Sequence, residues 1–141
     1  MLINLSNHPT AMWLPEQLSA AHSAYGEVFD LPFPAVPADA DEADIQNIAQ
    51  EYLKEVQTIA QEYLNKGQSV AKECLLKGQT IAPPAEAVVH IMGEMTLTYA
   101  IVCLLKQAGY TCVASTSVRE VYEEEPGKKT AVFRFVRFRK Y

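Results

Sequence analysis

The chain has 141 residues, of which 49% are hydrophobic and 21% are charged, and its net charge is −5 at pH 7. This length is typical of one domain that buries a core without disulfides or metal ions, and the composition excludes a disordered chain. No apolar run reaches the ~20 residues that a membrane-spanning helix needs. The N-terminus lacks a signal-peptide pattern. The three cysteines have no C-x-x-C spacing and indicate neither a zinc site nor a disulfide framework, so we expect a cytoplasmic location.

Charge is distributed unevenly along the chain. Residues 1–118 contain 5 basic and 13 acidic side chains, whereas residues 119–141 contain 7 basic and 4 acidic ones. The acidic balance argues against non-specific binding of duplex DNA. The cationic C-terminal segment leaves room for one anionic ligand.

The first third of the chain predicts two strands and a helix. The apolar run 1–5 predicts a strand, which ends at a polar loop over residues 6–9. Pro15 in a first helical turn and Gly26 at the end predict a helix between them. Residues 28–31 predict a second strand, which ends at prolines that cannot continue a sheet ladder.

An 11-residue repeat occupies the middle of the chain. Its copies are residues 47–57, 58–68 and 69–79, and a fourth begins at 80–82 before two prolines. A period of 11 keeps an apolar stripe on one side of an α-helix, so we expect a helix over 42–79, about 57 Å long if continuous. Such a helix overhangs the domain, folds back near Gly67, or packs against another subunit. A membrane-surface role is disfavoured because the polar face is not strongly basic.

The last third predicts two further strands, a helix and a hairpin. Residues 87–92 predict a buried strand, a helix follows from Gly93 to Gln107, and residues 110–114 predict a fourth strand. The remainder predicts a hairpin of residues 118–123 and 130–140 around a turn at 125–128. This order predicts a parallel three-layer α/β domain.

Ligands of open parallel sheets bind beyond the carboxyl ends of the strands, and small polar residues follow three of the predicted strands. The first such loop contains Ser6, Asn7 and His8, of which His8 could act as a general base or simply bond to backbone. Trp13 could stack on an adenine ring or cover the core. The loop expected at 115–117 contains Ser115 and Thr116.

The loop before the predicted helix at 93–107 has two interpretations. Gly93 and the N–H groups of Met95 and Thr96 could bind a phosphate at the positive helix end, with Glu94 on a ribose hydroxyl. Alternatively, Glu94 and Thr96 only cap the helix. Glu94 argues against a simple phosphate cradle because a carboxylate repels an anion.

Other polar residues carry weaker signals. Arg119 could reach the same crevice with a guanidinium suited to phosphate. His90 lies in an apolar run and is expected to be a core residue, and no metal-ligand spacing occurs. The alternating aromatic and cationic residues 133–139 resemble a single-strand RNA binder but are more typical of an edge strand. Without a Gly-x-Ser-x-Gly elbow, acyl-transfer hydrolysis has no support in the sequence.

Several stretches resemble the small stand-alone CRISPR-associated Rossmann-like (CARF-like) proteins, some of which are ring nucleases. They are Leu-Ile-Asn-Leu-Ser-Asn-His-Pro at the start, Val-His-Ile-Met-Gly-Glu-Met-Thr, Cys-Val-Ala-Ser-Thr-Ser-Val-Arg, and Gly-Lys-Lys with Phe-Arg-Phe-Val-Arg-Phe-Arg-Lys-Tyr near the end. The similarity covers residues 1–36 and 86–141. It implies one Rossmann-like domain over residues 1–141, with residues 42–82 as a helical insertion.

The resemblance also implies a function in antiviral defence. It implies a cytoplasmic homodimer or higher homo-oligomer that binds a cyclic oligoadenylate, most simply cyclic tetra-adenylate, across its two-fold axis. A ribose 2′-OH then attacks the adjacent phosphodiester without a metal ion or cofactor. His8, Asn7 and Arg119 are the expected catalytic residues. Expected ligand-binding residues are Ser6, Trp13, Gly93, Glu94, Met95, Thr96, Ser115 and Thr116.

Two alternatives stay open at this point. The same pocket could sequester the cyclic messenger without cleaving it, as a sensor or sponge. The chain could also be a helical protein-interaction module in which the repeat contacts a partner and the α/β part is a scaffold.

Overall fold

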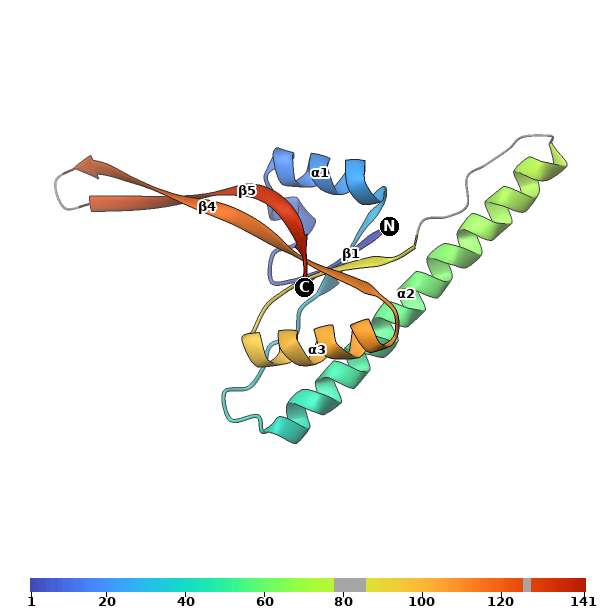
Figure 1. The fold of residues 1–141 in the computed structure, drawn as a ribbon, viewed down its shortest axis with the longest axis horizontal. Coiled ribbons are helices and arrows are strands. Elements are labelled where there is room, and N and C mark those ends of the chain that lie inside the picture. Colours follow the sequence, from blue (N-terminus) through green and yellow to red (C-terminus); the bar gives the residue numbers. More distant parts are fainter. Residues whose placement is uncertain (78–85, 126–127) are drawn as a thin grey trace.

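The computed structural model describes residues 1–77, 86–125 and 128–141. Within these residues the chain forms one five-stranded sheet flanked by three α-helices (Figure 1). In chain order the elements are β1 (Leu2–Ser6), the 3-10 turn η1 (Thr10–Met12), α1 (Pro15–Tyr25), β2 (Val28–Pro32), α2 (Glu42–Leu76), β3 (Val88–Met92), α3 (Met95–Gln107), β4 (Thr111–Glu125) and β5 (Lys128–Lys140). The expected mixed α/β class is confirmed.

The sheet is mostly parallel. Its strand order is β2-β1-β3-β4-β5, and the neighbours from β2 to β4 run parallel. Only β5 is antiparallel, because it returns beside β4 as the second half of a hairpin. The carboxyl ends of β1, β2 and β3 therefore lie at one edge of the sheet, where Ser6, Pro32 and Met92 stand in register.

Alternating side chains of the strands form two apolar layers. Ile3, Leu5 and Ile91 point to the face covered by α2 and α3, where the larger core lies. Leu2 and Val113 point to the opposite face, where they pack with α1 in a smaller cluster. The alternation follows from the pleat of a β-strand, which sends successive side chains to opposite faces.

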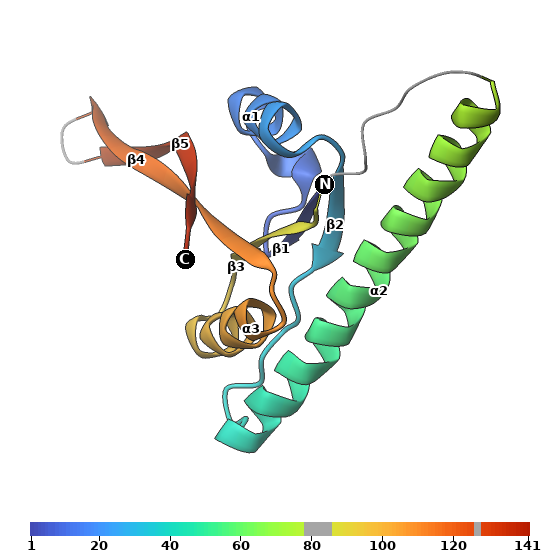
Figure 2. The same ribbon diagram turned by 45° about the vertical axis from the view of Figure 1, so that its right-hand side comes forward.

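Helix α2 is continuous through Gly67. The helix therefore does not fold back at that residue, which was one of the three arrangements considered from the sequence. Its 35 residues reach about 52 Å at 1.5 Å per residue. Ala49 and Val56 in its first half are buried against the sheet and α3, whereas Val70 and Leu76 are exposed. Figure 2 shows the C-terminal half extending beyond the sheet. The fourth repeat copy and the prolines after it lie outside the described residues.

Strand β4 does not break where the sequence predicts a loop. Residues 115–117 lie inside one 15-residue strand that pairs with β5 along most of its length. A bulge between Thr116 and Ser117 absorbs the local irregularity. Pairing with β5 satisfies the backbone of this polar stretch, and the local composition gives no sign of that long-range pairing. The tip of the expected turn, residues 126–127, lies outside the described residues.

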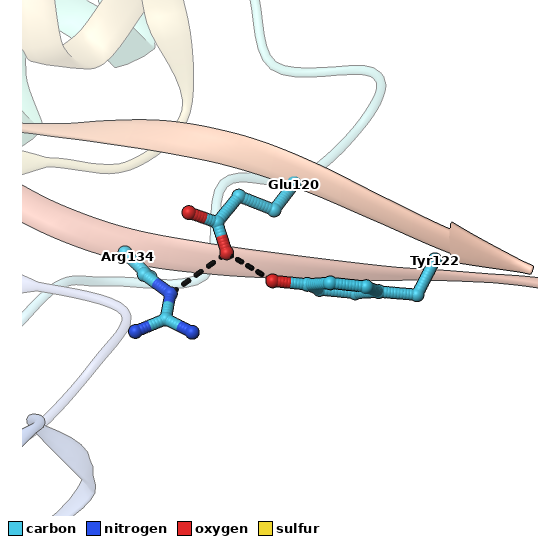
Figure 3. Close-up of polar contacts among 3 residues, drawn as sticks. All are labelled: Glu120, Tyr122 and Arg134. Carbon is cyan, nitrogen blue, oxygen red and sulfur yellow. Dashed lines mark hydrogen bonds and ion pairs between the residues drawn. The ribbon is translucent and has the colours of Figure 1, made fainter.

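The parts of β4 and β5 beyond the bulge between Thr116 and Ser117 project from the body of the molecule, and we call them the arm (Figures 1 and 2). On one face of the arm, the Glu120 carboxylate accepts hydrogen bonds from the Tyr122 hydroxyl and, at 2.8 Å, from Arg134 Nε (Figure 3). These two donors lower the pKa of Glu120 below its usual range. The group is solvent-exposed, so it contributes little to stability.

Candidate functional site

A row of three polar side chains crosses the centre of the sheet. Asp30, Asn4 and His90 occupy matching positions in β2, β1 and β3, where Asn4 is directly opposite each of the other two. Each interrupts an otherwise apolar strand on the face that α1 covers. Asn4 and His90 are only 1% exposed. Buried polar groups at this depth need hydrogen-bond partners, and they supply them to one another.

Asn4 holds the row together through four hydrogen bonds. Its Nδ2 donates to Asp30 Oδ1 at 2.7 Å and to the His8 carbonyl at 2.9 Å. Its Oδ1 accepts from Ser6 Oγ and lies 2.8 Å from His90 Nδ1. Because the donor side faces a carboxylate and a carbonyl, only one orientation of the amide satisfies all its partners.

The bonds of Asn4 fix the tautomer of His90. Nδ1 carries the proton, since it faces the Asn4 oxygen, so Nε2 is an acceptor and lies 3.2 Å from Ser115 Oγ. Burial, and to a lesser degree the nearby His8, lowers the pKa of His90 from 6.5 to about 4. His90 is therefore a neutral imidazole at physiological pH.

Two aromatic rings pack against His90. The Trp13 ring meets it edge-on at a centroid distance of 5.3 Å, and Phe138 does so at 5.5 Å. Trp13 Nε1 donates to the His8 carbonyl at 3.0 Å, which ties the tryptophan to the loop after β1. Trp13 thus covers the core on one side and borders open space on the other.

That open space is a cleft of about 480 Å³ at the carboxyl ends of β1 and β3, bounded by the base of the arm. Its polar side chains are Ser6, His8, Gln17, His90, Ser115, Thr116 and Ser117. Its apolar side chains are Met12, Trp13, Leu14, Met92, Phe133 and Phe135. Among the residues that the structure describes, no Lys, Arg, Asp or Glu lines this cleft.

Five of the expected site residues meet at the cleft. They are Ser6, His8, Trp13, Ser115 and Thr116. The last two reach it from the middle of β4 rather than from a loop. The Thr116 hydroxyl donates to the Arg137 carbonyl of β5 at 3.1 Å.

The two other residues expected to be catalytic lie apart from this group. The Asn7 backbone N–H bonds the Met92 carbonyl at the end of β3, and its side chain does not line the cleft. Arg119 is exposed on the arm directly opposite Phe133. Strand alternation places Arg119 on the same face as Ser117 and Phe133, at the outer end of the cleft.

At residues 93–96 the structure has the capping arrangement, which was the alternative to a phosphate cradle. The Glu94 carboxylate caps α3 by accepting from the N–H groups of Thr96 and Leu97 at 2.9 and 2.8 Å, and from the Thr96 hydroxyl. These hydrogen bonds lower the pKa of Glu94. The carboxylate thus takes the N–H groups that a phosphate would need.

Gly93 also has a structural reason for being glycine. A Cβ at this position would lie 2.4 Å from the buried Phe33 ring. Close packing of the ring against the backbone, rather than the approach of a ligand, explains the residue. Met95 is exposed on α3 outside the cleft.

The sequence interpretation missed the centre of the site. It assigned His90 to the core and gave no role to Asn4, Asp30 or Ser117. A detectable signal was present, because Asn4, Asp30 and His90 are each the single polar residue in the middle of a short apolar strand. Only the observed bounds of these strands place the three residues at matching central positions.

Two further properties concern the described residues only. No group of three or more His, Cys, Asp and Glu side chains in them is arranged to hold a metal ion. None of their helices is long and apolar enough to cross a membrane.

Comparison with known proteins identifies a family without assigning a function. Residues 1–139 match the model of the uncharacterized protein MJ1673 family, so the chain belongs to that family. No curated protein and no solved structure matches the chain.

Proposed function

We propose that this member of the MJ1673 family is a CRISPR-associated ring nuclease, which binds and cleaves a cyclic oligoadenylate such as cyclic tetra-adenylate. The observation that carries the proposal is the cleft itself. It combines aromatic rings, which stack on bases, with hydroxyl and imidazole groups, which hydrogen-bond ribose and phosphate. It also lies at the carboxyl ends of parallel strands, where ligands of such sheets bind. The parallel order with helices on both faces supports a Rossmann-like class.

Cleavage in this proposal needs no metal ion. The ribose 2′-OH attacks its own phosphodiester, and the product is a linear oligonucleotide that ends in a 2′,3′-cyclic phosphate. The protein aligns the hydroxyl with the phosphorus and stabilises the charge that develops on the phosphate oxygens. In this proposal, His8 and Thr116 of the cleft contact the scissile phosphate.

A homodimer fits the electrostatics of the cleft. No cation lines the cleft within the described part of one copy, whereas Arg119 stands at its outer end on the projecting arm. In the proposed dimer, one cyclic ligand lies across the two-fold axis and meets an arginine from each copy. The oligomer is part of the proposal.

One observation favours sequestration as a second candidate function. A ring nuclease must stabilise a phosphorane-like transition state, and His90, the one buried titratable group that lines the cleft in the described part of the chain, is neutral at physiological pH. A neutral cleft can still bind bases by stacking. A sponge that retains the cyclic messenger would therefore use the same residues without turnover.

The deciding experiment incubates the purified protein with cyclic tri-, tetra- and hexa-adenylate in EDTA, followed by chromatography and mass spectrometry. We expect linear products with a terminal cyclic phosphate from one ring size. Intact ligand that co-elutes with the protein would establish the sponge instead. Failure to bind any of the three rings would overturn both functions.

Arg119→Ala tests the place of the arm in the site. We expect it to weaken binding of the cyclic ligand by about 1–3 kcal/mol, the range for losing a charge-assisted hydrogen bond. Isothermal titration calorimetry of the variant measures this change directly.

Arg134→Ala is the matched control for that variant. It removes the same charge from the same arm, but Arg134 lies on the opposite face and pairs with Glu120. Equal loss of affinity in the two variants would show a general charge effect and would remove Arg119 from the site.

A further inference from the structure

We infer that Ser115 is a nucleophilic serine, with His90 as its proton acceptor and Asn4 as a positioning residue, and that the cleft transfers acyl groups from uncharged carboxylic esters. This activity is separate from attack by a substrate 2′-OH and does not depend on it.

The geometry is that of a nucleophile, a base and a residue that orients the base. Ser115 Oγ lies 3.2 Å from His90 Nε2, and the opposite ring nitrogen lies 2.8 Å from Asn4 Oδ1. Asn4 is itself held by Asp30 at 2.7 Å. Such an arrangement is recognised by these mutual contacts rather than by a sequence motif. It can therefore form on a strand as well as on the elbow that the sequence lacks.

The hydroxyl proton of Ser115 has one good acceptor. Met92 Sδ lies 2.8 Å from Ser115 Oγ, but a thioether accepts hydrogen bonds only weakly. The unprotonated Nε2 of His90 is the stronger acceptor. The bond from Ser115 to His90 leaves the oxygen lone pairs of Ser115 free for attack.

The exposure of the Ser115 hydroxyl distinguishes His90 from a histidine with a purely structural role. His90 is buried, but its Nε2 faces a partly exposed hydroxyl at the wall of the cleft rather than a buried backbone group. A core histidine needs no contact with such a hydroxyl. The position connects a buried base with a surface that substrate can reach.

The lining of the cleft selects the class of ester. Met12, Leu14 and Phe133 offer an apolar wall, and no charged side chain of the described residues lines the cleft. An anionic ester would lose its hydration there without gaining a cation, whereas an uncharged ester with an apolar group would bury surface. The Ser117 hydroxyl and the His8 ring are the nearby donors for a developing oxyanion.

The reaction proceeds in two balanced steps. Ser115 Oγ bonds to the carbonyl carbon while its proton moves to His90 Nε2, and the C–O bond to the alcohol then breaks as His90 returns the proton to the leaving oxygen. The result is an acyl-serine and a free alcohol. Water then attacks the acyl carbon by the reverse route, which yields the carboxylic acid and regenerates Ser115.

The test is covalent labelling with an uncharged alkyl fluorophosphonate. Ser115 Oγ bonds to phosphorus, fluoride leaves with the electron pair of the P–F bond, and the serine proton passes to His90. We expect one adduct per chain, located at Ser115 by fragmentation of the peptide that spans residues 107–119. A general base contributes roughly 100-fold or more, so Ser115 should react at least that much faster than Ser117.

Ser117 serves as the internal control because it is exposed in the same cleft, two residues along the same strand. No contact of Ser117 with an imidazole occurs among the described residues. Ser115→Ala should abolish the adduct. It should also abolish release of p-nitrophenol from p-nitrophenyl butyrate. Equal labelling of Ser115 and Ser117, or no labelling of the folded protein, would overturn the inference.

The pH dependence of labelling tests whether His90 acts as the proton acceptor rather than only as a structural residue. The titratable groups near its ring are His8 after β1 and Asp30 of β2, the latter through Asn4, while Trp13 and Phe138 are uncharged. A base with a pKa of about 4 stays unprotonated, so the rate should be flat from pH 8 to pH 6. Equally fast labelling of Ser115 in folded His90→Gln would contradict His90 as the base.

Asn4→Asp combined with Asp30→Asn tests the positioning role, because Asn4→Asp alone would set two carboxylates 2.7 Å apart. A carboxylate beside Nδ1 raises the pKa of His90, so the labelling profile should bend at a higher pH while labelling stays at Ser115. An unchanged profile in the folded variant would remove Asn4 from the mechanism.

The result of the ester test does not depend on the result of the cyclic-oligoadenylate test. Ser115 labelling in a protein that binds no cyclic ligand would keep this inference and overturn the proposed function. Cleavage of a cyclic ligand without Ser115 labelling would do the reverse.

Discussion

Asn4→Ala is expected to lower the free energy of unfolding by about 3–5 kcal/mol, a large share of the 5–15 kcal/mol typical of a domain. Asn4 is 1% exposed and makes four hydrogen bonds. Its removal leaves His90 Nδ1–H without a partner, at a cost of roughly 1–3 kcal/mol, and also removes the charge-assisted hydrogen bond to Asp30, which is worth roughly 1.5–3 kcal/mol. Denaturant titration of the folded variant measures the change.

A double-mutant cycle separates the hydrogen-bond cost from lost packing. Replacing both partners by apolar groups removes the unsatisfied atoms, so Asn4→Leu combined with His90→Phe should cost less than the sum of the two single variants. Strict additivity, or a loss below about 1 kcal/mol for Asn4→Ala, would show that solvent reaches the polar row when a partner is lost.

Local signals in the sequence were sufficient for most of the fold. Pro15 and Gly26 bracket α1 as expected, and the apolar runs before Ser6 and Gly93 became β1 and β3. The repeating apolar stripe of α2 predicted a helix from residue 42. Each of these features is decided by residues that are close in sequence, so the pattern alone carries the information.

The sequence interpretation was incomplete for both long-range and local reasons. Residues 115–117 look like a loop, but pairing with β5 keeps them in β4. Glu94 seemed to stand in the way of a phosphate, and it instead occupies the N–H groups itself. Gly67 weakens an isolated helix by about 1 kcal/mol relative to alanine, yet α2 passes through it. Tertiary pairing overrides local preference in the first case, whereas the Glu94 cap is a local interaction and α2 continues through Gly67 where its C-terminal half extends beyond the sheet.

The site was only partly predictable, because the register of neighbouring strands is a long-range feature. Ligands of open parallel sheets bind beyond the carboxyl ends of the strands, and this rule predicted the edge of the sheet where Ser6 and His8 lie. His90 was assigned to the core because a single sequence does not show which residues stand opposite one another. The register of β1 with β2 and β3 is what turns three isolated polar residues into one network. That network links the buried centre of the sheet to the cleft through Ser115.

The same network should make stability depend on pH. His90 has a pKa of about 4 in the folded protein, against the ordinary 6.5 in the unfolded chain. Below pH 6.5 the unfolded chain therefore binds a proton that the folded protein does not, so the free energy of unfolding falls as the pH falls. At about 1.4 kcal/mol per pKa unit, the loss is about 2 kcal/mol between pH 7 and pH 5 and about 3 kcal/mol by pH 4.

Urea titrations of the wild type and of His90→Gln at pH 7, 6, 5 and 4 measure this dependence. Glutamine does not titrate and can keep a hydrogen bond to Asn4, so the pH slope attributable to His90 should disappear in the variant. The lowered pKa of Glu94 destabilises the protein only below its ordinary value of 4.5, and the lowered pKa of the Met1 amino group acts in both proteins, so the difference between their slopes from pH 7 to pH 5 belongs to His90. His22→Gln is the matched control, because His22 is exposed on α1 and its replacement should leave the slope intact. An equal slope in wild type and His90→Gln would mean that His90 takes up its proton in the folded state. Nε2 would then be protonated below about pH 6.5, so labelling of Ser115 should slow over the same interval.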